Sequence, residues 1–222
     1  MQESPELSTG ATPHQSPSAL RFFAQLVSVF FHPLFIPTWL TVFTVYREPY
    51  FFAGLNSRQL LFKLISVVFS TAFLPLFSVL LMKQLGFIKS IFLRDQKDRI
   101  IPYIVSMIFY FWAWYVSRNL HDHPAQTAML LAVFLCSIAG MMANIYYKIS
   151  MHGLAVGAMV CWFIWLAYYV SPLAALYLPL AILVTGLVCT ARFVVSDHSP
   201  FEIYSGLIGG IICQLIAIAV TG

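Results

Sequence analysis

The sequence predicts an all-α fold, a polytopic bundle of transmembrane helices. Of its 222 residues, 60% are hydrophobic and only 9% are charged, whereas soluble domains carry roughly 25% charged residues. A water-soluble fold of this size could not bury so much apolar side chain. The apolar runs are continuous and do not alternate with polar residues, which favours helices over a membrane β-barrel.

Seven apolar runs follow a polar segment. Residues 1–20 are rich in Ser, Pro, Thr, Gln and Glu, and we expect a disordered polar tail because they cannot bury enough apolar surface to fold. Residues 21–222 then form one transmembrane domain. A helix needs about 20 apolar residues to cross the hydrocarbon core, and six runs meet or nearly meet that length. The seven runs lie near residues 22–46, 60–82, 101–117, 126–147, 151–170, 172–191 and 203–221.

The first run is interrupted by prolines, so the prediction is six core spans plus a Pro-interrupted first hydrophobic segment. His32-Pro33 and Pro37 lie inside this run, and each proline removes a hydrogen bond from a helix and crowds the preceding turn. The run is either a kinked crossing or an interfacial or re-entrant segment. Pro75 and Pro179 lie inside later runs, which we expect them to kink.

Close helix packing and free thiols are expected inside the bundle. Gly153 and Gly157 share one face of the fifth run, and Gly206 and Gly210 share one face of the seventh. This spacing of small residues lets helix backbones touch. The cysteines lie in apolar runs and lack CxxC spacing, so we expect buried, unpaired thiols at Cys136, Cys161, Cys189 and Cys213.

Polar residues gather in three clusters at the ends of the predicted spans. The first, Arg94-Asp95-Gln96-Lys97-Asp98-Arg99, precedes Pro102. Proline is well tolerated at the start of a helix, so the third span should begin near here. The second cluster, residues 148–153, opens the fifth span. Its Ser150 is a candidate N-cap, which leaves backbone N–H groups and the positive end of the helix dipole for a phosphate, beside His152.

The third cluster contains Arg192, His198 and Glu202 and leads into a helix that Pro200 should start. Glu202 lies one turn after His198. At that spacing a carboxylate can accept a hydrogen bond from one imidazole nitrogen and leave the other as a nucleophile. The planar guanidinium of Arg192 is suited to phosphate oxygens.

Two spans separate each cluster from the next, so all three should emerge on the same face of the membrane. Two histidines, several guanidinium groups, a helix N-terminus and a carboxylate could then converge. Attack on a phosphate monoester needs cations for the phosphoryl oxygens, a nucleophile and an acid. The net charge of +4 is too small and dispersed to indicate a nucleic-acid partner, but it is compatible with anionic lipid headgroups or a phosphorylated substrate.

In this order the clusters resemble the three signatures of the type-2 phosphatidate phosphatase superfamily, in its bacterial-type, membrane-bound lipid phosphatase branch. Arg192-x5-His198-x3-Glu202 resembles the third signature, Ser-Arg-x5-His-x3-Asp. Ser150-Met151-His152 resembles the second, Pro-Ser-Gly-His. Arg99 with Pro102 resembles the first, Lys-x6-Arg-Pro. The resemblance covers about residues 90–215.

The resemblance implies a membrane phosphatase that works through a phosphohistidine intermediate. His198 would attack phosphorus, Glu202 would orient it, and His152 would protonate the leaving alcohol. No metal or other cofactor is implied. The substrate would be a membrane lipid phosphate or a polyprenyl phosphate or diphosphate, and the site would face the extracytoplasmic side of a bacterial inner membrane. The phosphate ligands would be Arg192, Arg99 and Ser150, with Arg94 or Lys97 in place of the family lysine.

The chain departs from the family pattern at five positions. Ala191, Ile149 and Met151 replace the motif serine, proline and glycine. Glu202 replaces an aspartate, and Phe92 stands where the family lysine is expected. These changes leave open a second hypothesis, a degenerate and non-enzymatic membrane protein that binds or transports a lipid phosphate.

Charge does not orient the chain in the membrane. Outside the clusters, Lys and Arg divide about equally between the two faces, so the positive-inside rule gives no answer.

A third hypothesis is metal binding by His121-Asp122-His123. This short loop lies on the face opposite the clusters and is better explained as an interfacial connection.

Overall fold

The computed structural model of the chain describes residues 17–88, 90, 96–195 and 198–221. Within these ranges every regular element is helical, and six helices are long and apolar enough to cross a membrane. The prediction of an all-α bundle typical of an integral membrane protein is therefore confirmed. The six spans are Ser57–Gln84, Lys97–Asn119, Pro124–Tyr146, Met151–Val170, Leu178–Val195 and Pro200–Thr221.

The helices that build these spans follow one another with short connections. A π-helical turn joins α3 to α4, and another extends α7 to residue 170. In chain order the α-helices are α1 (Ser18–Phe30), α2 (Ile36–Arg47), α3 (Ser57–Val68), α4 (Leu74–Gln84), α5 (Gln96–Asn119), α6 (Pro124–Tyr146), α7 (Met151–Trp165), α8 (Leu178–Val195) and α9 (Pro200–Thr221).

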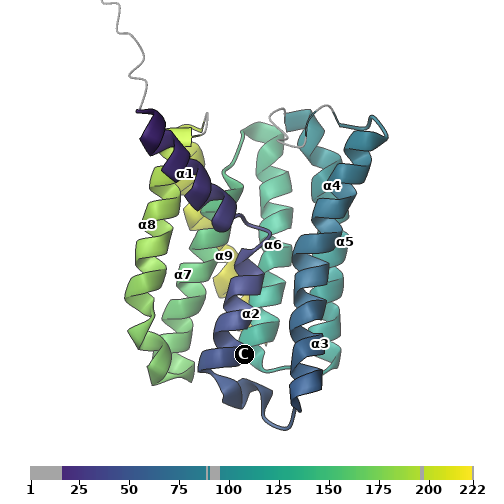
Figure 1. Cartoon of the computed structure of the whole chain (residues 1–222), viewed down its shortest axis with the longest axis vertical. Coiled ribbons are helices and arrows are strands. Elements are labelled where there is room, and N and C mark those ends of the chain that lie inside the picture. Colours follow the sequence, from purple (N-terminus) through teal and green to yellow (C-terminus); the bar gives the residue numbers. More distant parts are fainter. Residues whose placement is uncertain (1–16, 89, 91–95, 196–197, 222) are drawn as a thin grey trace, which may run out of the picture.

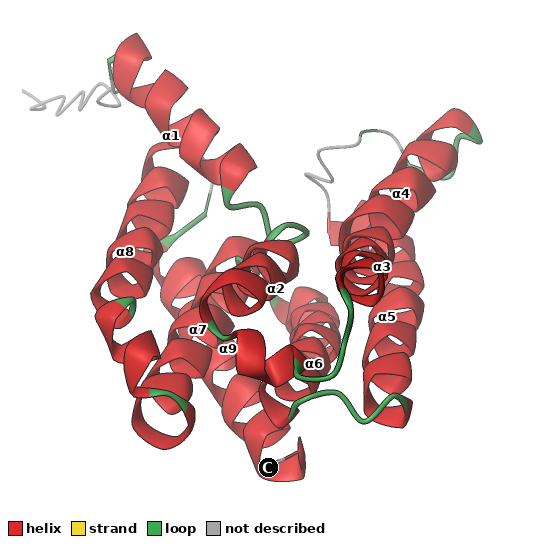
Figure 2. Ribbon diagram, turned by 60° about the horizontal axis from the view of Figure 1, so that its bottom comes forward, coloured by secondary structure: helices red, strands yellow, loops and turns green. Residues whose placement is uncertain are grey.

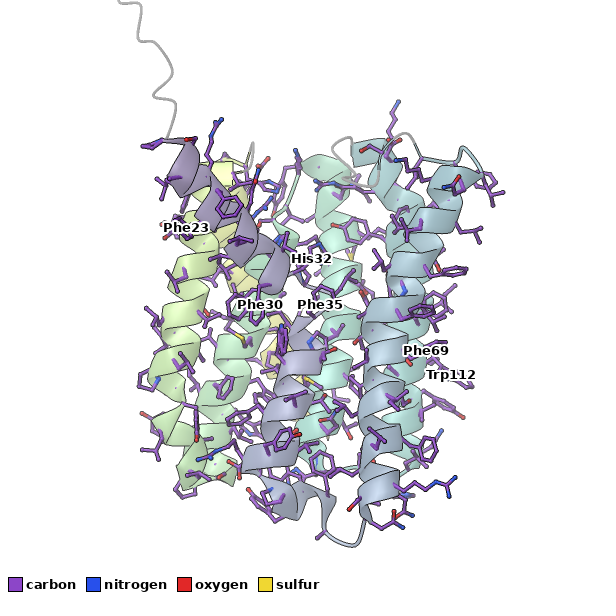
Figure 3. The ribbon with its side chains drawn as sticks, in the orientation of Figure 1. Phe23, Phe30, His32, Phe35, Phe69 and Trp112 are labelled. Carbon is purple, nitrogen blue, oxygen red and sulfur yellow. The ribbon has the colours of Figure 1, made fainter. Side chains whose placement is uncertain are left out.

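The helices form three groups around one core. Figure 2 shows α1 and α8 on one side of the bundle, α3, α4 and α5 on the other, and α2, α6, α7 and α9 between them. The indole of Trp162 on α7 is fully buried and donates to the carbonyl of Ala125 at 2.9 Å, which satisfies the polar atom of this large core side chain. By contrast, Phe69 and Trp112 are exposed on the outside of the bundle (Figure 3), as contact with lipid requires.

The first hydrophobic segment runs through the bundle in two pieces. α1 slants across the end where α8 finishes, and α2 continues to the opposite end, where α9 also finishes (Figure 1). The two helices have 13 and 12 residues, so each covers about 18–20 Å at 1.5 Å per residue. Neither is long enough to cross alone. The kinked crossing is therefore the alternative that the structure supports, broken at His32-Pro33 as the prolines predict.

Both glycine pairs lie at a close helix contact, as predicted, and the structure shows that they pack against each other. A methyl group added to Gly153 would lie 2.7 Å from the carbonyl oxygen of Ile203, and one added to Gly206 would lie 2.6 Å from that of Ser150. Gly157 meets the backbone of α9 even more closely. The backbones of α7 and α9 therefore touch along a stripe that begins beside the second and third clusters.

Several local predictions need correction. Of the predicted tail, residues 1–20, the first 16 residues lie outside the described ranges. Residues 18–20 are helical, because α1 begins at Ser18. Pro179 causes no kink, since it lies in the first turn of α8, where its missing N–H is not needed. At Pro75, where a kink was expected, the second span leaves the regular α-helix in a π-helical turn that directly precedes α4. The predicted thiols are confirmed, since all four cysteines are buried and unpaired.

Candidate functional site

The three clusters lie at one end of the bundle, as counting the spans predicts. α5 and α7 begin there, α8 ends there, and α9 begins there, next to the start of α1 (Figure 1). α5 begins at Gln96, somewhat before the predicted start, which places Lys97 and Arg99 in its first turns and leaves Pro102 inside the helix. Arg94 lies outside the described residues.

His198 and Glu202 make the predicted contact. The imidazole Nδ1 of His198 lies 3.0 Å from Oε2 of Glu202. A carboxylate only accepts, so Nδ1 carries the proton and Nε2 keeps its lone pair. The His198 side chain is 6% exposed and that of Glu202 is 17% exposed, so the pair is largely shielded from water. This is the geometry of an oriented imidazole nucleophile.

A capping box fixes Glu202 in place. The hydroxyl of Ser199 accepts from the N–H of Glu202 at 3.3 Å, and the same Oε2 of Glu202 accepts from the N–H of Ser199 at 3.0 Å. One carboxylate oxygen therefore holds both the helix start and the His198 ring. Sequence reasoning missed this box, although Ser199-Pro-Phe-Glu202 has its spacing. The additional methylene of glutamate supplies the reach that this double contact uses.

The start of α7 is joined directly to the start of α9. The N–H of Ser150 donates to the carbonyl of Glu202 at 3.1 Å. The hydroxyl of Ser150 accepts from the N–H of Gly153 at 3.3 Å, which confirms the predicted N-cap. Ser150 is fully buried. A direct contact between its hydroxyl and a phosphate, as predicted, therefore requires the site to open, and in this state the hydroxyl serves the cap.

His152 lies beneath α1. Its Nε2 is 3.0 Å from the carbonyl oxygen of Ser28, and only 9% of the residue is exposed. The rings of His152 and His32 meet edge to face, with centroids 5.2 Å apart. Sequence reasoning did not assign Ser28 or His32 to the site. No spacing rule connects positions that are more than 100 residues apart.

One guanidinium group lies within electrostatic reach of both histidines. The charge of Arg192, at the end of α8, acts on both His152 and His198. Arg192 is partly buried and also lies within electrostatic reach of Arg99. Two guanidinium groups held near each other favour a bound anion between or beside them. Lys97, in contrast, is exposed at the start of α5.

The environment of His198 keeps it neutral near pH 7. Burial is the main cause that lowers its pKa below the usual 6.5, and the charges of Arg192 and Lys148 act in the same direction. The hydrogen bond and charge of Glu202 oppose them without cancelling them. A neutral imidazole with a free Nε2 lone pair is the form that can attack phosphorus. Lys148, the first residue of the second cluster, thus contributes to the electrostatic environment of His198.

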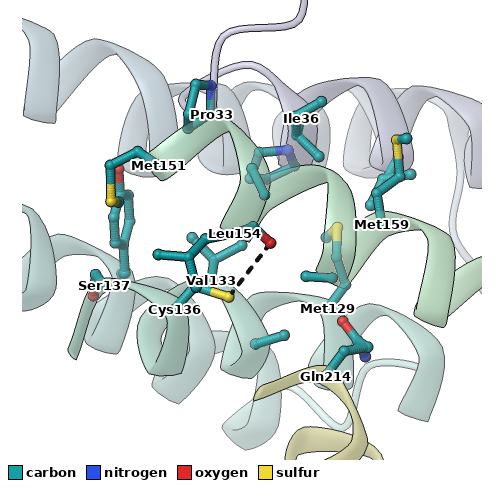
Figure 4. A pocket seen from close by; sticks show the side chains of 16 residues that line it. Pro33, Ile36, Met129, Val133, Cys136, Ser137, Met151, Leu154, Met159 and Gln214 are labelled. Atoms are coloured by element: carbon teal, nitrogen blue, oxygen red, sulfur yellow. Dashed lines mark hydrogen bonds between the residues drawn. The ribbon is translucent and has the colours of Figure 1, made fainter. Parts of the chain in front are cut away.

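An apolar cavity begins beside the second cluster. Met151, between Ser150 and His152, lines its wall together with residues of α2, α6, α7 and α9 (Figure 4). Pro33 lines it from the break between α1 and α2. Ser137 and Gln214 are polar exceptions in a lining made otherwise mostly of aliphatic, methionine and cysteine side chains.

The loop of His121, Asp122 and His123, at the opposite end of the bundle, holds neighbouring helices together. Asp122 forms an ion pair with Lys63 and accepts a hydrogen bond from the hydroxyl of Ser117 at 2.8 Å. His123 stacks on Phe51 with ring centroids 3.7 Å apart. These contacts tie α3, α5 and α6 together, as an interfacial connection should.

Comparison of the chain with protein-family models, with curated proteins and with solved structures finds no match. The site therefore has to be interpreted from its own geometry and chemistry.

Proposed function

We propose that this protein is a divergent member of the type-2 phosphatidate phosphatase superfamily that hydrolyses a lipid phosphate or diphosphate. The observation that carries the proposal is the His198–Glu202 hydrogen bond of 3.0 Å, made where the starts of α7 and α9 meet. A neutral, oriented and shielded imidazole within electrostatic reach of Arg192, which itself lies within reach of Arg99, is suited to in-line attack on a phosphoryl group.

In the first step Nε2 of His198 attacks phosphorus, and the bond between phosphorus and the leaving alcohol oxygen breaks. Protonated His152 gives its proton to that oxygen, so the alcohol leaves neutral. Arg192 and Arg99 offset the charge on the phosphoryl oxygens, and the first-turn N–H groups of α7 offer further donors. Ser150 supports them by capping α7.

In the second step water attacks the phosphohistidine, and the phosphorus–nitrogen bond of His198 breaks. His152, now neutral, takes the proton of the water, which restores both histidines and releases inorganic phosphate. The arginines supply the positive charge for this reaction, so the proposed chemistry includes no metal or organic cofactor.

The lipid nature of the substrate is supported by the surroundings of the site. The cavity that Met151 lines, next to His152 in the sequence, lies in the apolar interior of the bundle, where a hydrocarbon chain is favoured over water. A phosphate at the end of the bundle and a chain directed along this cavity describe one molecule, a lipid or polyprenyl phosphate. The replacement of the motif glycine by Met151 adds apolar wall to this path.

Placement in the cell follows from the same proposal. We assign the chain to a bacterial inner membrane with the site on the extracytoplasmic side. The start of α1 shares the end of the bundle that carries the site, so a tag at the N-terminus should be accessible from the same side as the site. Protease accessibility of tags at the two termini would test this orientation.

The function is tested with purified protein in detergent and a panel of lipid phosphates and diphosphates. Release of inorganic phosphate by the wild type and its loss in His198→Ala supports the phosphatase. Binding of lipid phosphate that is equal in both proteins, with no release by the wild type from any panel member, would establish the non-enzymatic binder instead.

A further inference from the structure

α1 contacts the histidine that the proposed reaction uses as its acid. The carbonyl of Ser28 accepts a hydrogen bond from Nε2 of His152 at 3.0 Å. A carbonyl oxygen has no proton to give, so Nε2 of His152 must carry one. Nδ1 is then the ring nitrogen that remains for proton transfer. α1 packs along α8, and Ser28 is 6% exposed, so this contact is a buried part of the fold.

The second contact to His152 comes from the break between α1 and α2. The rings of His32 and His152 meet at 84° with centroids 5.2 Å apart. Nδ1 of His32 accepts from the backbone N–H of Leu34 at 3.3 Å, so the turn itself holds the His32 ring. His152 is therefore fixed at one ring nitrogen by a carbonyl and at its side by a second ring.

We propose that Ser28 and His32 are positioning residues for His152, and that the first hydrophobic segment is thereby a working part of the active site. The inference rests on the proposed function, since it assigns supports to the acid of that reaction. Neither residue belongs to the three motif clusters.

The electrostatic surroundings explain why such support is needed. The charged and titratable groups that act on His152 are Arg192 from α8, His198 from the loop before α9, and His32. Of these, the permanent charge of Arg192 disfavours a positive charge on the His152 ring. The Ser28 carbonyl acts in the opposite direction, because a hydrogen bond to the ring N–H stabilises the imidazolium. Docking of α1 therefore fixes the orientation of the His152 ring and the nitrogen that bears its hydrogen.

The competing explanation is ordinary packing, in which His32 only fills space at a helix break. Three substitutions separate the two. His32→Asn keeps the turn, because an asparagine oxygen can accept from the N–H two residues on, but removes the ring. His32→Phe keeps a ring and loses the turn bond. His32→Ala loses both.

We expect kcat to fall about 10- to 100-fold in His32→Ala and His32→Asn, since a displacement of about 1 Å can cost 10²-fold. His32→Phe should recover most of this loss, with KM little changed throughout. The control is His123→Ala, a histidine at the other end of the bundle whose Nδ1 also accepts from an N–H two residues on. This control should keep wild-type turnover.

A readout that does not need turnover completes the test. Nitrogen NMR of isotope-labelled histidine, with the signal assigned through His152→Gln, should show Nε2 of His152 protonated in the wild type and a mixture of tautomers in His32→Ala. Wild-type turnover in His32→Asn, or an unchanged tautomer signal in His32→Ala, would overturn the inference. If the wild type releases no phosphate, the proposed function fails, and the tautomer signal alone decides whether the first segment positions His152.

Discussion

Gly206→Ala should weaken the site by separating α7 from α9. The new methyl group would lie 2.6 Å from the carbonyl oxygen of Ser150, whereas real contacts of this kind stay above 3.0 Å. The helices must therefore part by at least about 0.4 Å, and by about 0.8 Å to reach an ordinary contact of 3.4 Å. The nearby hydrogen bond from Ser150 to Glu202, now 3.1 Å, would be stretched to the limit of a hydrogen bond or beyond it.

Two effects on stability oppose each other in this variant. Overpacking costs roughly 1–3 kcal/mol, and alanine gains about 1 kcal/mol over glycine inside a helix. The net loss of stability is then roughly 0–2 kcal/mol. Activity should respond more strongly, because a displacement of about 1 Å between catalytic groups can cost 10²-fold. We expect kcat to fall about 10-fold with a modest change in Tm.

The assay is phosphate release from a lipid phosphate, alongside thermal unfolding in detergent. The matched control is Gly186→Ala, because a methyl group there meets nothing within 4 Å. It should keep full activity and gain slightly in Tm. If Gly206→Ala and Gly186→Ala have the same turnover, the close contact of α7 and α9 does not organise the site and the reasoning is refuted.

Three further predictions concern the charges around the site and at the opposite end. Glu202→Gln removes the charge that raises the pKa of His198; the acid limb of kcat/KM, which lies below pH 6.5 in the wild type, should move lower still while the plateau drops about 100-fold. An acid limb that stays in place would show that Glu202 does not act on the nucleophile. Lys148→Gln removes a charge that lowers the same pKa, so its acid limb should move toward pH 6.5, and a shift to lower pH would contradict this. Asp122→Ala leaves Lys63 without its partner and should cost roughly 1–3 kcal/mol of stability, measured as a lower Tm, with turnover of the folded protein unchanged.

The sequence predicted the features that depend on local residue spacing or on counting the spans. Apolar run lengths predicted the six spans, and the even number of spans between clusters predicted their common end. The four-residue spacing predicted the contact between His198 and Glu202. The glycine spacing predicted a close helix contact on each of two runs, and only the structure shows that α7 and α9 are each other's partners.

Where the sequence failed, the decisive contact joins distant positions. Proline chemistry could not say whether the first run crosses, since a broken crossing and a re-entrant segment contain the same breaks. The contact between Ser28 and His152 depends on how α1 packs along α8, which no local pattern encodes. Burial of Ser150 was also out of reach, because it follows from the carbonyl of Glu202 and the backbone of Gly206 lying against it.

The central claim is that His198 becomes covalently phosphorylated. It is tested by incubating the protein with a lipid phosphate that carries radiolabelled phosphate, stopping the reaction in alkali, where phosphohistidine persists, and mapping the label. The proposal predicts an acid-labile label on the peptide containing His198 in the wild type and none in His198→Ala. Phosphate release at the wild-type rate by His198→Ala, or a label on another residue, would contradict it.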